Sequence, residues 1–170
     1  MATPSIKQIA IGDLEQEIKL TRKVLERLPE EHYAWKPHEK SMSLAALGSH
    51  VANLLYWQTM TLQLDGLDLA GLPPQPAPPT SQAELLDKFD RNAAVLRETL
   101  AATDDAAFGE PWTLRSGDHV HFTLPRAAVM RSMGISHMIH HRAQLTVYLR
   151  LLDEPVPAVY GPSADERGMM

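Results

Sequence analysis

The sequence predicts an all-α protein built as a four-helix bundle. Apolar residues recur at helical spacing in four segments of roughly 20 residues or more. A proline-rich stretch separates the second segment from the third, and no long run alternates apolar and polar residues as a half-buried strand does. At 170 residues the chain has the size of one domain. We therefore expect residues 1–170 to form a single helical domain.

The first helix is expected over about residues 9–28, where leucine and isoleucine side chains from Leu14 to Leu28 follow one another three or four positions apart. Pro29 would end this helix because it cannot continue the hydrogen-bond ladder. The polar connection that follows contains Trp35, which we expect to pack against one end of the bundle.

The second helix is expected over about residues 44–65, with Ser43 as its N-terminal cap and Gly66 as its end. Its apolar face contains His50. The next segment, "GLPPQPAPPT" at residues 71–80, is too rich in proline to be helical. We expect it to cross the surface as an extended loop.

The third helix is expected to begin after Ser81, because "SQAE" has the form of a capping box with Glu84 at its third position. The segment "PWTLRSGDHVHFTLP", at residues 111–125, has β-favouring runs around a Ser-Gly-Asp turn, so the sequence also admits a short β-hairpin between the third and fourth helices. Pro125 suits the first turn of a fourth helix that reaches about Leu152.

Composition excludes several classes of function. The formal net charge is -5 and no run of Lys or Arg occurs, so we expect no nucleic-acid partner. The chain has no cysteine, which excludes disulfides, thiolate zinc sites and cysteine nucleophiles. With neither a signal-like N-terminus nor about 18 consecutive apolar residues, it is expected to be cytoplasmic and to have no membrane partner.

Histidine, aspartate and glutamate remain as metal ligands, and "GISHMIHHRAQL" at residues 134–145 contains three histidines. At 100° per residue, His137 and His141 share the buried face of the fourth helix, whereas His140 is displaced towards its edge. The arginines of this helix fall off that face. Side chains four residues apart on a helix lie one above the other, so two imidazoles can reach one ion.

His50 adds a third imidazole from the second helix. A lone buried histidine is more often a core residue with hydrogen-bond partners, but one divalent ion would satisfy all three rings of His50, His137 and His141. Three neutral ligands leave coordination positions open, as in catalytic sites, where a metal-bound water or thiol would react. Zinc, nickel, iron and manganese all accept such ligands.

Other side chains on these faces have less specific roles. Gln144 and Thr61 are candidate acceptors for the second ring nitrogen of a ligand. Trp57 and Tyr148 can line a substrate pocket or pack in the core, and the core is the simpler interpretation. His119 and His121 flank the expected hairpin and are expected to face solvent unless the hairpin brings one to the ion. The remaining histidines, His32 and His38, are expected at the surface.

A second, weakly apolar stripe is expected on the back of the fourth helix, formed by Ala128, Ile135, Ile139 and Ala143. The bundle core cannot also cover this face in the predicted helix. We therefore expect it to contribute to a homodimer contact.

Three motifs in order, "KPHEKSMSLAALGSHVA", "HMIHHRAQLTVYLRLL" and "EPVPAVYGPSADE", resemble the DinB family of DinB/YfiT-like metalloenzymes over about residues 10–166. The resemblance implies an up-down-down-up four-helix bundle, often homodimeric, with a divalent metal on His50, His137 and His141. Ala143 departs from the usual glycine of the family's HRGQ signature. Nothing in the sequence is similar to the DNA polymerase that shares the family's name.

The resemblance leaves two functional hypotheses open. The first is a metal-dependent enzyme acting on a small molecule, as a hydrolase or as an S-transferase that uses a low-molecular-weight thiol. The second is a non-catalytic dimeric module for binding or stress response, in which the histidines or their metal join the helices. The sequence shows no carboxylate near the three histidines to act as general base, which counts against hydrolysis.

Overall fold

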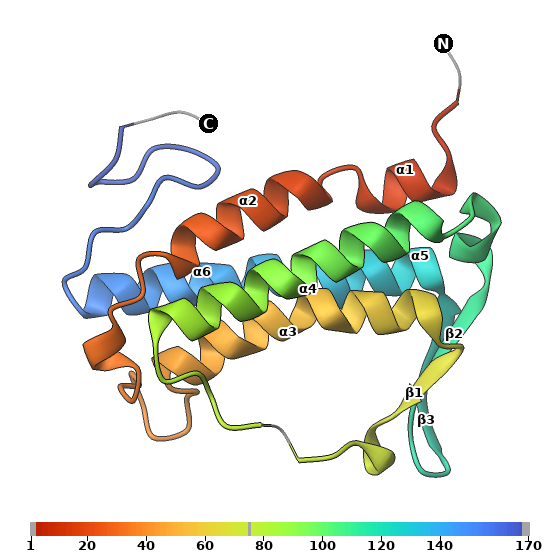
Figure 1. The fold of residues 1–170 in the computed structure, drawn as a ribbon, viewed down its shortest axis with the longest axis horizontal. Helices are drawn as coiled ribbons and strands as arrows, with labels where there is room; N and C mark the ends of the chain where they lie inside the picture. The colour runs from red at the N-terminus through yellow and green to blue at the C-terminus, as the bar shows by residue number, and fades with distance from the viewer. Residues whose placement is uncertain (1–2, 75, 168–170) are drawn as a thin grey trace.

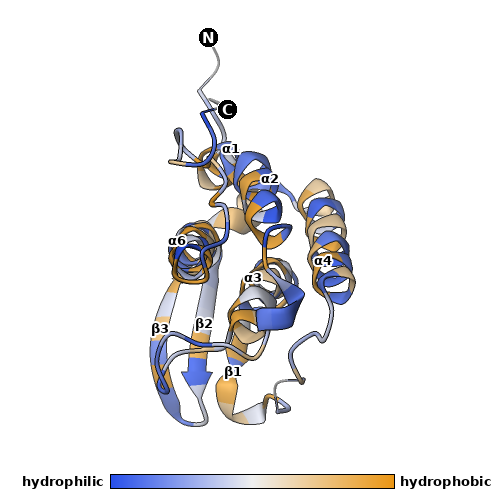
Figure 2. Ribbon diagram, turned by 90° about the vertical axis from the view of Figure 1, so that its left-hand side faces the viewer, coloured by the Kyte–Doolittle hydropathy of each residue, from blue (hydrophilic) through white to orange (hydrophobic). Residues whose placement is uncertain are grey.

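The computed structural model describes residues 3–74 and 76–167. These residues form a mostly helical structure with a small three-stranded sheet at one side (Figures 1 and 2). Seen end-on in Figure 2, the long helices surround a common interior. They are α2 (Leu14–Leu25), α3 (Leu44–Gln63), α4 (Gln82–Ala102) and α6 (His137–Leu151). No helix in the described ranges combines the length and apolar character needed to cross a membrane.

The prediction of one continuous first helix is wrong. The structure has α1 (Ile6–Ile11), capped by Ser5, and then the longer α2. Gly12 and Asp13 separate the two helices, and both residue types are poor helix formers in a helix interior. Trp35 packs against the main core, with its ring edge-to-face on Tyr148 at 5.6 Å, as expected for the end of a bundle.

The predicted starts of α3 and α4 are confirmed. The Ser43 side chain accepts a hydrogen bond from the amide of Ala46 at 3.3 Å, and Ser81 accepts from the amide of Glu84 at 3.2 Å. The Glu84 carboxylate reaches back to the amide of Thr80 at 2.8 Å. Local capping chemistry therefore fixed both helix starts, and with them the position of His50 in the second turn of α3.

The sheet corrects the all-α prediction. The expected hairpin is present as β2 (Pro111–Ser116) and β3 (His119–Pro125), which pair antiparallel. β1 (Gly66–Asp68) was missed and pairs parallel with β2. Gly66 is thus a strand residue and not a helix end, and a Cβ on it would collide with the Thr113 carbonyl. Three residues are too short a run to show a strand period.

The fourth helix also departs from prediction. It begins as α5 (Arg126–Val129), continues as a π-helical segment (Met130–Ser136) and becomes α6. A π-helix has more residues per turn than an α-helix, so a 100° projection carried across it assigns the wrong faces. Ile135, expected on the outer stripe, is completely buried, and Ile139 packs against the main core. The predicted dimer stripe is therefore wrong in these two residues; the π-helical segment accounts for Ile135, whereas Ile139 lies in the regular α6.

Two apolar clusters stabilise the fold. The larger lies between the helices and includes Leu25, Leu55, Phe89 and Leu149. The smaller lies where the sheet packs on α3 and the π-helical segment, with Trp112 at its centre and Trp57 at its margin. The smaller cluster holds the sheet beside α3, and β1 leads into the proline-rich loop that continues along the same helix (Figure 1).

Arg142 is buried although it lies away from the histidine face of α6. Its side chain is 2% exposed and pairs with Glu17 of α2 at 2.7 Å. Tyr160 donates to the Glu17 carboxylate at 2.8 Å, and the Arg142 guanidinium lies 4.9 Å from the Tyr160 ring centroid. A helix of a bundle has two packed neighbours, so a polar residue off one buried face can lie on another.

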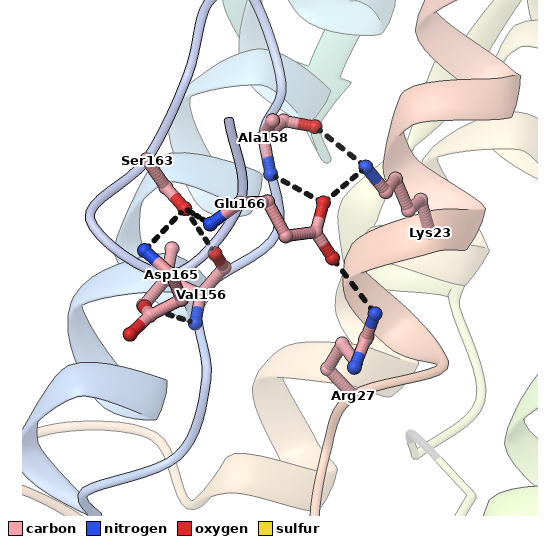
Figure 3. Close-up of polar contacts among 7 residues, drawn as sticks. All are labelled: Lys23, Arg27, Val156, Ala158, Ser163, Asp165 and Glu166. Atoms are coloured by element: carbon pink, nitrogen blue, oxygen red, sulfur yellow. Dashed lines mark hydrogen bonds and ion pairs between the residues drawn. The ribbon is translucent and has the colours of Figure 1, made fainter. Parts of the chain in front are cut away.

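The segment after α6 folds back beside α2 (Figures 1 and 3). Glu166 pairs with Lys23 at 2.6 Å and with Arg27 at 2.8 Å. Lys23 also donates to the carbonyl of Ala158 at 3.1 Å. Within the segment, Ser163 donates to the carbonyl of Val156 at 2.6 Å, which closes a compact turn.

Candidate metal centre

α3 and α6 bring His50, His137 and His141 together. The three rings each offer a nitrogen, and these nitrogens all lie within 4.8 Å of one another. The ring centroid of His50 lies 5.2 Å from that of His137 and 4.6 Å from that of His141. The three side chains are half-buried, so the cluster lies at the edge of the helical interior and not at its centre.

Close approach of α3 to the helix preceding His137 depends on Gly134. A Cβ at this position would lie 2.5 Å from Cδ of Gln58, a completely buried residue of α3. A residue larger than glycine would push the two helices apart. Gly134 in the π-helical segment therefore helps to place His137 opposite α3.

The hydrogen-bond partners of His137 and His141 determine which ring nitrogens are free. Nδ1 of His141 lies 2.7 Å from Oε1 of Gln144, and the Met133 carbonyl accepts from the ring of His137. Each partner is an oxygen acceptor, so each ring uses its N–H there. The two Nε2 atoms lie 2.8 Å apart, close enough to hold one proton or one cation between them.

The rings of His50 and His137 are neutral at neutral pH. Burial, followed by the nearby rings of His141 and His137, lowers the pKa of His50 to about 4. Burial also lowers the pKa of His137, with a further contribution from His141, while the Met133 carbonyl opposes the shift. Neutral imidazole is the form that binds metal ions, so no proton has to be displaced from these two rings at pH 7.

This donor set fits a divalent transition-metal ion. Metal–nitrogen bonds of about 2.0–2.1 Å place the nitrogens of a tetrahedral site about 3.3 Å apart. The observed separations, from 2.8 Å to at most 4.8 Å, lie on either side of that value, so small side-chain rotations suffice. The contacts of Gln144 and the Met133 carbonyl resemble the outer hydrogen bonds that orient metal-binding histidines.

A groove runs from Met42 along α3 to Met60, and His50 lines it. It has a volume of about 900 Å³ and is bounded on its other side by Leu67 of β1 and by residues of the segments 69–74 and 76–78, which belong largely to the proline-rich loop. The loop was expected only to cross the surface. Its prolines carry no long-range signal in the sequence, so the position of the loop across the groove from α3 could not be predicted.

The other expected pocket residues have different places. Trp57 lines the groove and also packs on Trp112, with ring centroids 5.7 Å apart. Tyr148 is buried, and its hydroxyl donates to the Met42 carbonyl at 3.2 Å, so it belongs to the core. Thr61 donates to the carbonyl of Trp57 at 3.0 Å and does not contact the histidines.

The remaining histidines lie outside the cluster. His140 is exposed, as the helical phase predicted, with its ring centroid 4.8 Å from that of His141. His119 and His121 are exposed on β3, and His121 bonds Ser116 at 2.9 Å. His32 and His38 are also exposed. The metal-ligand geometry found in the described residues is thus confined to His50, His137 and His141.

A family model described as the DinB superfamily matches residues 13–145. The chain belongs to the DinB superfamily. The matched range contains all three histidines and ends before the C-terminal segment. No curated protein matches the sequence.

Three solved structures similar to this chain are described as DinB-like or as a putative member of the DinB family. A DinB-like protein from Bacillus cereus is 20% identical, with a TM-score of 0.67 over 89% of this chain and 95% of the other. A DinB-like protein from Bacillus subtilis is 15% identical, with a TM-score of 0.65 over 95% and 99%. A DinB-family protein from Exiguobacterium sibiricum is 18% identical, with a TM-score of 0.63 over 92% and 98%. At these identities the similarity shows the fold alone.

Proposed function

We propose that this protein is a metal-dependent enzyme that acts on a small molecule, with His50, His137 and His141 as the metal ligands. The observation that carries the proposal is the position of the cluster. Three imidazoles converge, and one of them, His50, lines a groove of about 900 Å³, within the size range of small-molecule sites. A purely structural ion does not need such a groove.

The residues around the cluster have separable roles. His50 faces the groove, whereas Gln144 and the Met133 carbonyl hold the rings of His141 and His137 from behind. A bound divalent ion supplies Lewis-acid chemistry, lowering the pKa of a water or thiol that reaches it. Zinc, nickel, iron and manganese are compatible with three nitrogen donors.

Thiol transfer fits the surroundings better than hydrolysis. Among the described residues that line the groove, none is an aspartate or glutamate that could act as general base. A thiolate needs no such base once its proton has been lost, because it is itself the nucleophile. We therefore place an S-transferase using a low-molecular-weight thiol ahead of a hydrolase.

Metal analysis tests the proposal. Protein purified without a nickel column is expected to contain about one equivalent of a transition metal, and a His50→Ala/His137→Ala/His141→Ala variant is expected to contain none. The His119→Ala/His121→Ala variant, which changes an exposed pair, is the matched control. Less than about 0.1 equivalent in the wild type, unchanged in the triple variant, would contradict metal binding. A screen of metal-loaded protein with several cellular thiols then tests transfer.

The second candidate, a dimeric binding or stress-response module, is supported by an exposed apolar face on α6. Val147 and Leu151, four residues apart, are 56% and 57% exposed, and Ala143 precedes them by one turn. This face replaces the stripe expected from the sequence as the proposed homodimer contact. Sedimentation of Val147→Glu tests it, and a dimer that persists in this variant would exclude the face.

The helix directions in Figure 1 support the up-down-down-up order that the family resemblance implies. α2 and α6 run one way and α3 and α4 the other, with the long crossing between α3 and α4. In this order the two helices that carry the histidines are antiparallel neighbours.

A further inference from the structure

We infer that the groove beside His50 binds an uncharged, largely apolar small molecule, and that this molecule is the electrophile in thiol transfer and not the thiol: the thiol sulfur forms a new S–C bond by addition to it, and the thiol proton goes to the adjoining atom of the electrophile. The inference rests on the proposed function for its chemistry. The binding itself can be tested without metal. Its evidence is the lining of the groove, the exposure of apolar residues around it and the polar groups next to His50.

The groove has no charged wall. Among the described residues that line it, none is Asp, Glu, Lys or Arg. The apolar lining includes Leu54, Met60, Leu67 and Leu72, followed by several prolines of the loop. A charged ligand would lose its hydration here without gaining an ion pair with a lining side chain. Cellular thiols that carry carboxylates or ammonium groups are therefore poorly matched to this groove.

Apolar side chains are exposed around the groove. Met42, Tyr56, Leu69 and Leu72 are 40%, 50%, 38% and 37% exposed, and all four line it. Exposed apolar residues gathered on one concave surface are typical of a ligand site. The prolines of the loop have a fixed φ, so this wall loses little conformational entropy when a ligand binds.

Polar groups are concentrated near His50. Ser49 and Asn53 flank it on α3 and line the groove. Ser49 accepts from Lys88 at 2.9 Å, which leaves its own O–H free to donate. The side-chain amide of Asn53 makes no hydrogen bond within the described part of the chain and can both donate and accept. A ligand with one polar, reactive end would direct that end towards the histidine cluster.

Two fluorescent probes with the same aromatic skeleton and different charge test the inference. N-phenylnaphthylamine is uncharged, and anilinonaphthalene sulfonate adds one negative charge. With metal-free wild-type protein, we expect the uncharged probe to bind at least about tenfold more tightly than the sulfonate. Energy transfer from tryptophan should fall more in Trp57→Phe than in Trp35→Phe, because only Trp57 lines the groove.

Two leucine variants locate the binding. Leu72→Glu, at the groove, should weaken binding of the uncharged probe about tenfold, whereas Leu151→Glu, on the exposed face of α6, should not change it. Equal affinity for the two probes, or equal affinity in the two variants, would overturn the inference.

The groove assignment and the metal-dependent function can fail independently in these experiments. His137→Ala should lose metal and retain the probe, because His137 does not line the groove. Metal binding by protein that does not bind the uncharged probe would overturn the groove assignment alone. Probe binding by a wild-type protein that takes up no metal would overturn the metal-dependent function alone.

Discussion

On one face of α6, His137 and His141 direct ring nitrogens towards His50 of α3. On another face Arg142 lies against Glu17 of α2, although His141 and Arg142 are adjacent in sequence. Arg142 has an anionic partner, a hydroxyl from Thr21 at 3.2 Å and an aromatic ring beside it. The histidines have no charged partner among the described residues, and the Nε2 atoms of His137 and His141 lie 2.8 Å apart.

The difference distinguishes an architectural contact from a candidate site. The Arg142 group is charge-balanced within the chain, so it joins α2, α6 and the C-terminal segment without a ligand. The histidine cluster gathers three ring nitrogens within 4.8 Å of one another without a charged partner among the described residues, and its His50 lines a groove. Burial alone would not have separated the two, because the arginine is the more buried of them.

The largest effect on stability is expected at the arginine face. Arg142→Met leaves the buried Glu17 carboxylate without its cation and should lower the free energy of unfolding by about 3–5 kcal/mol, measured by urea denaturation. Arg131→Met, which removes an exposed cation 3.5 Å from Asp13, is the control and should cost less than about 1 kcal/mol. The double variant Arg142→Met/Glu17→Met should recover part of the loss; a double variant less stable than Arg142→Met would contradict the pairing.

The histidine face should respond in metal affinity and not in stability. His141→Ala should weaken metal binding more than about 100-fold, and Gln144→Ala about 10–100-fold, because Gln144 only orients a ligand. Metal-free His141→Ala should unfold within about 1 kcal/mol of the wild type. Competition titration with a chelating dye measures the affinities. Equal losses of metal affinity in His141→Ala and His140→Ala would contradict the assignment of the histidine face as the metal site, since His140 lies outside the cluster.

The metal-free protein should lose stability in mild acid because of His50. Its pKa is about 4 in the folded protein and near 6.5 when unfolded, so between these values the unfolded chain binds the additional proton. The contribution is present above pH 6.5 and is lost as the pH falls towards 4. Urea denaturation across this range should show a weaker pH dependence in His50→Gln. An unchanged profile in that variant would assign the acid sensitivity to other groups.

The smallest effect is expected in the C-terminal segment (Figure 3). Hydrogen bonding to Lys23, with further donation from the Ala158 amide, lowers the pKa of Glu166, so its contribution is lost as the pH falls through that lowered value. Glu166→Gln should lower the melting temperature slightly, and added salt should remove the difference because these pairs are partly exposed. A loss as large as that of Arg142→Met would mean that the segment is essential to the fold.

Helix starts, the three clustered histidines and the hairpin could be predicted from the sequence because their signals are local. Ser43 and Ser81 fix helix starts through backbone amides one turn away, and the spacing of His137 and His141 lies within a regular part of α6. His50 could be added because it lies on the apolar face of α3, a uniformly helical segment. The Ser-Gly-Asp turn marked the hairpin for the same reason, with Gly117 at a positive φ of 57°.

The tertiary structure decided what depends on contacts between distant segments. The π-helical segment buries Ile135, and β1 exists because Gly66 can approach Thr113. Arg142 is buried because Glu17 and Tyr160, far away in sequence, supply its partners. The proline-rich loop becomes a groove wall only because the sheet places it beside α3. Helical spacing selects which residues share a face, but packing determines what that face meets.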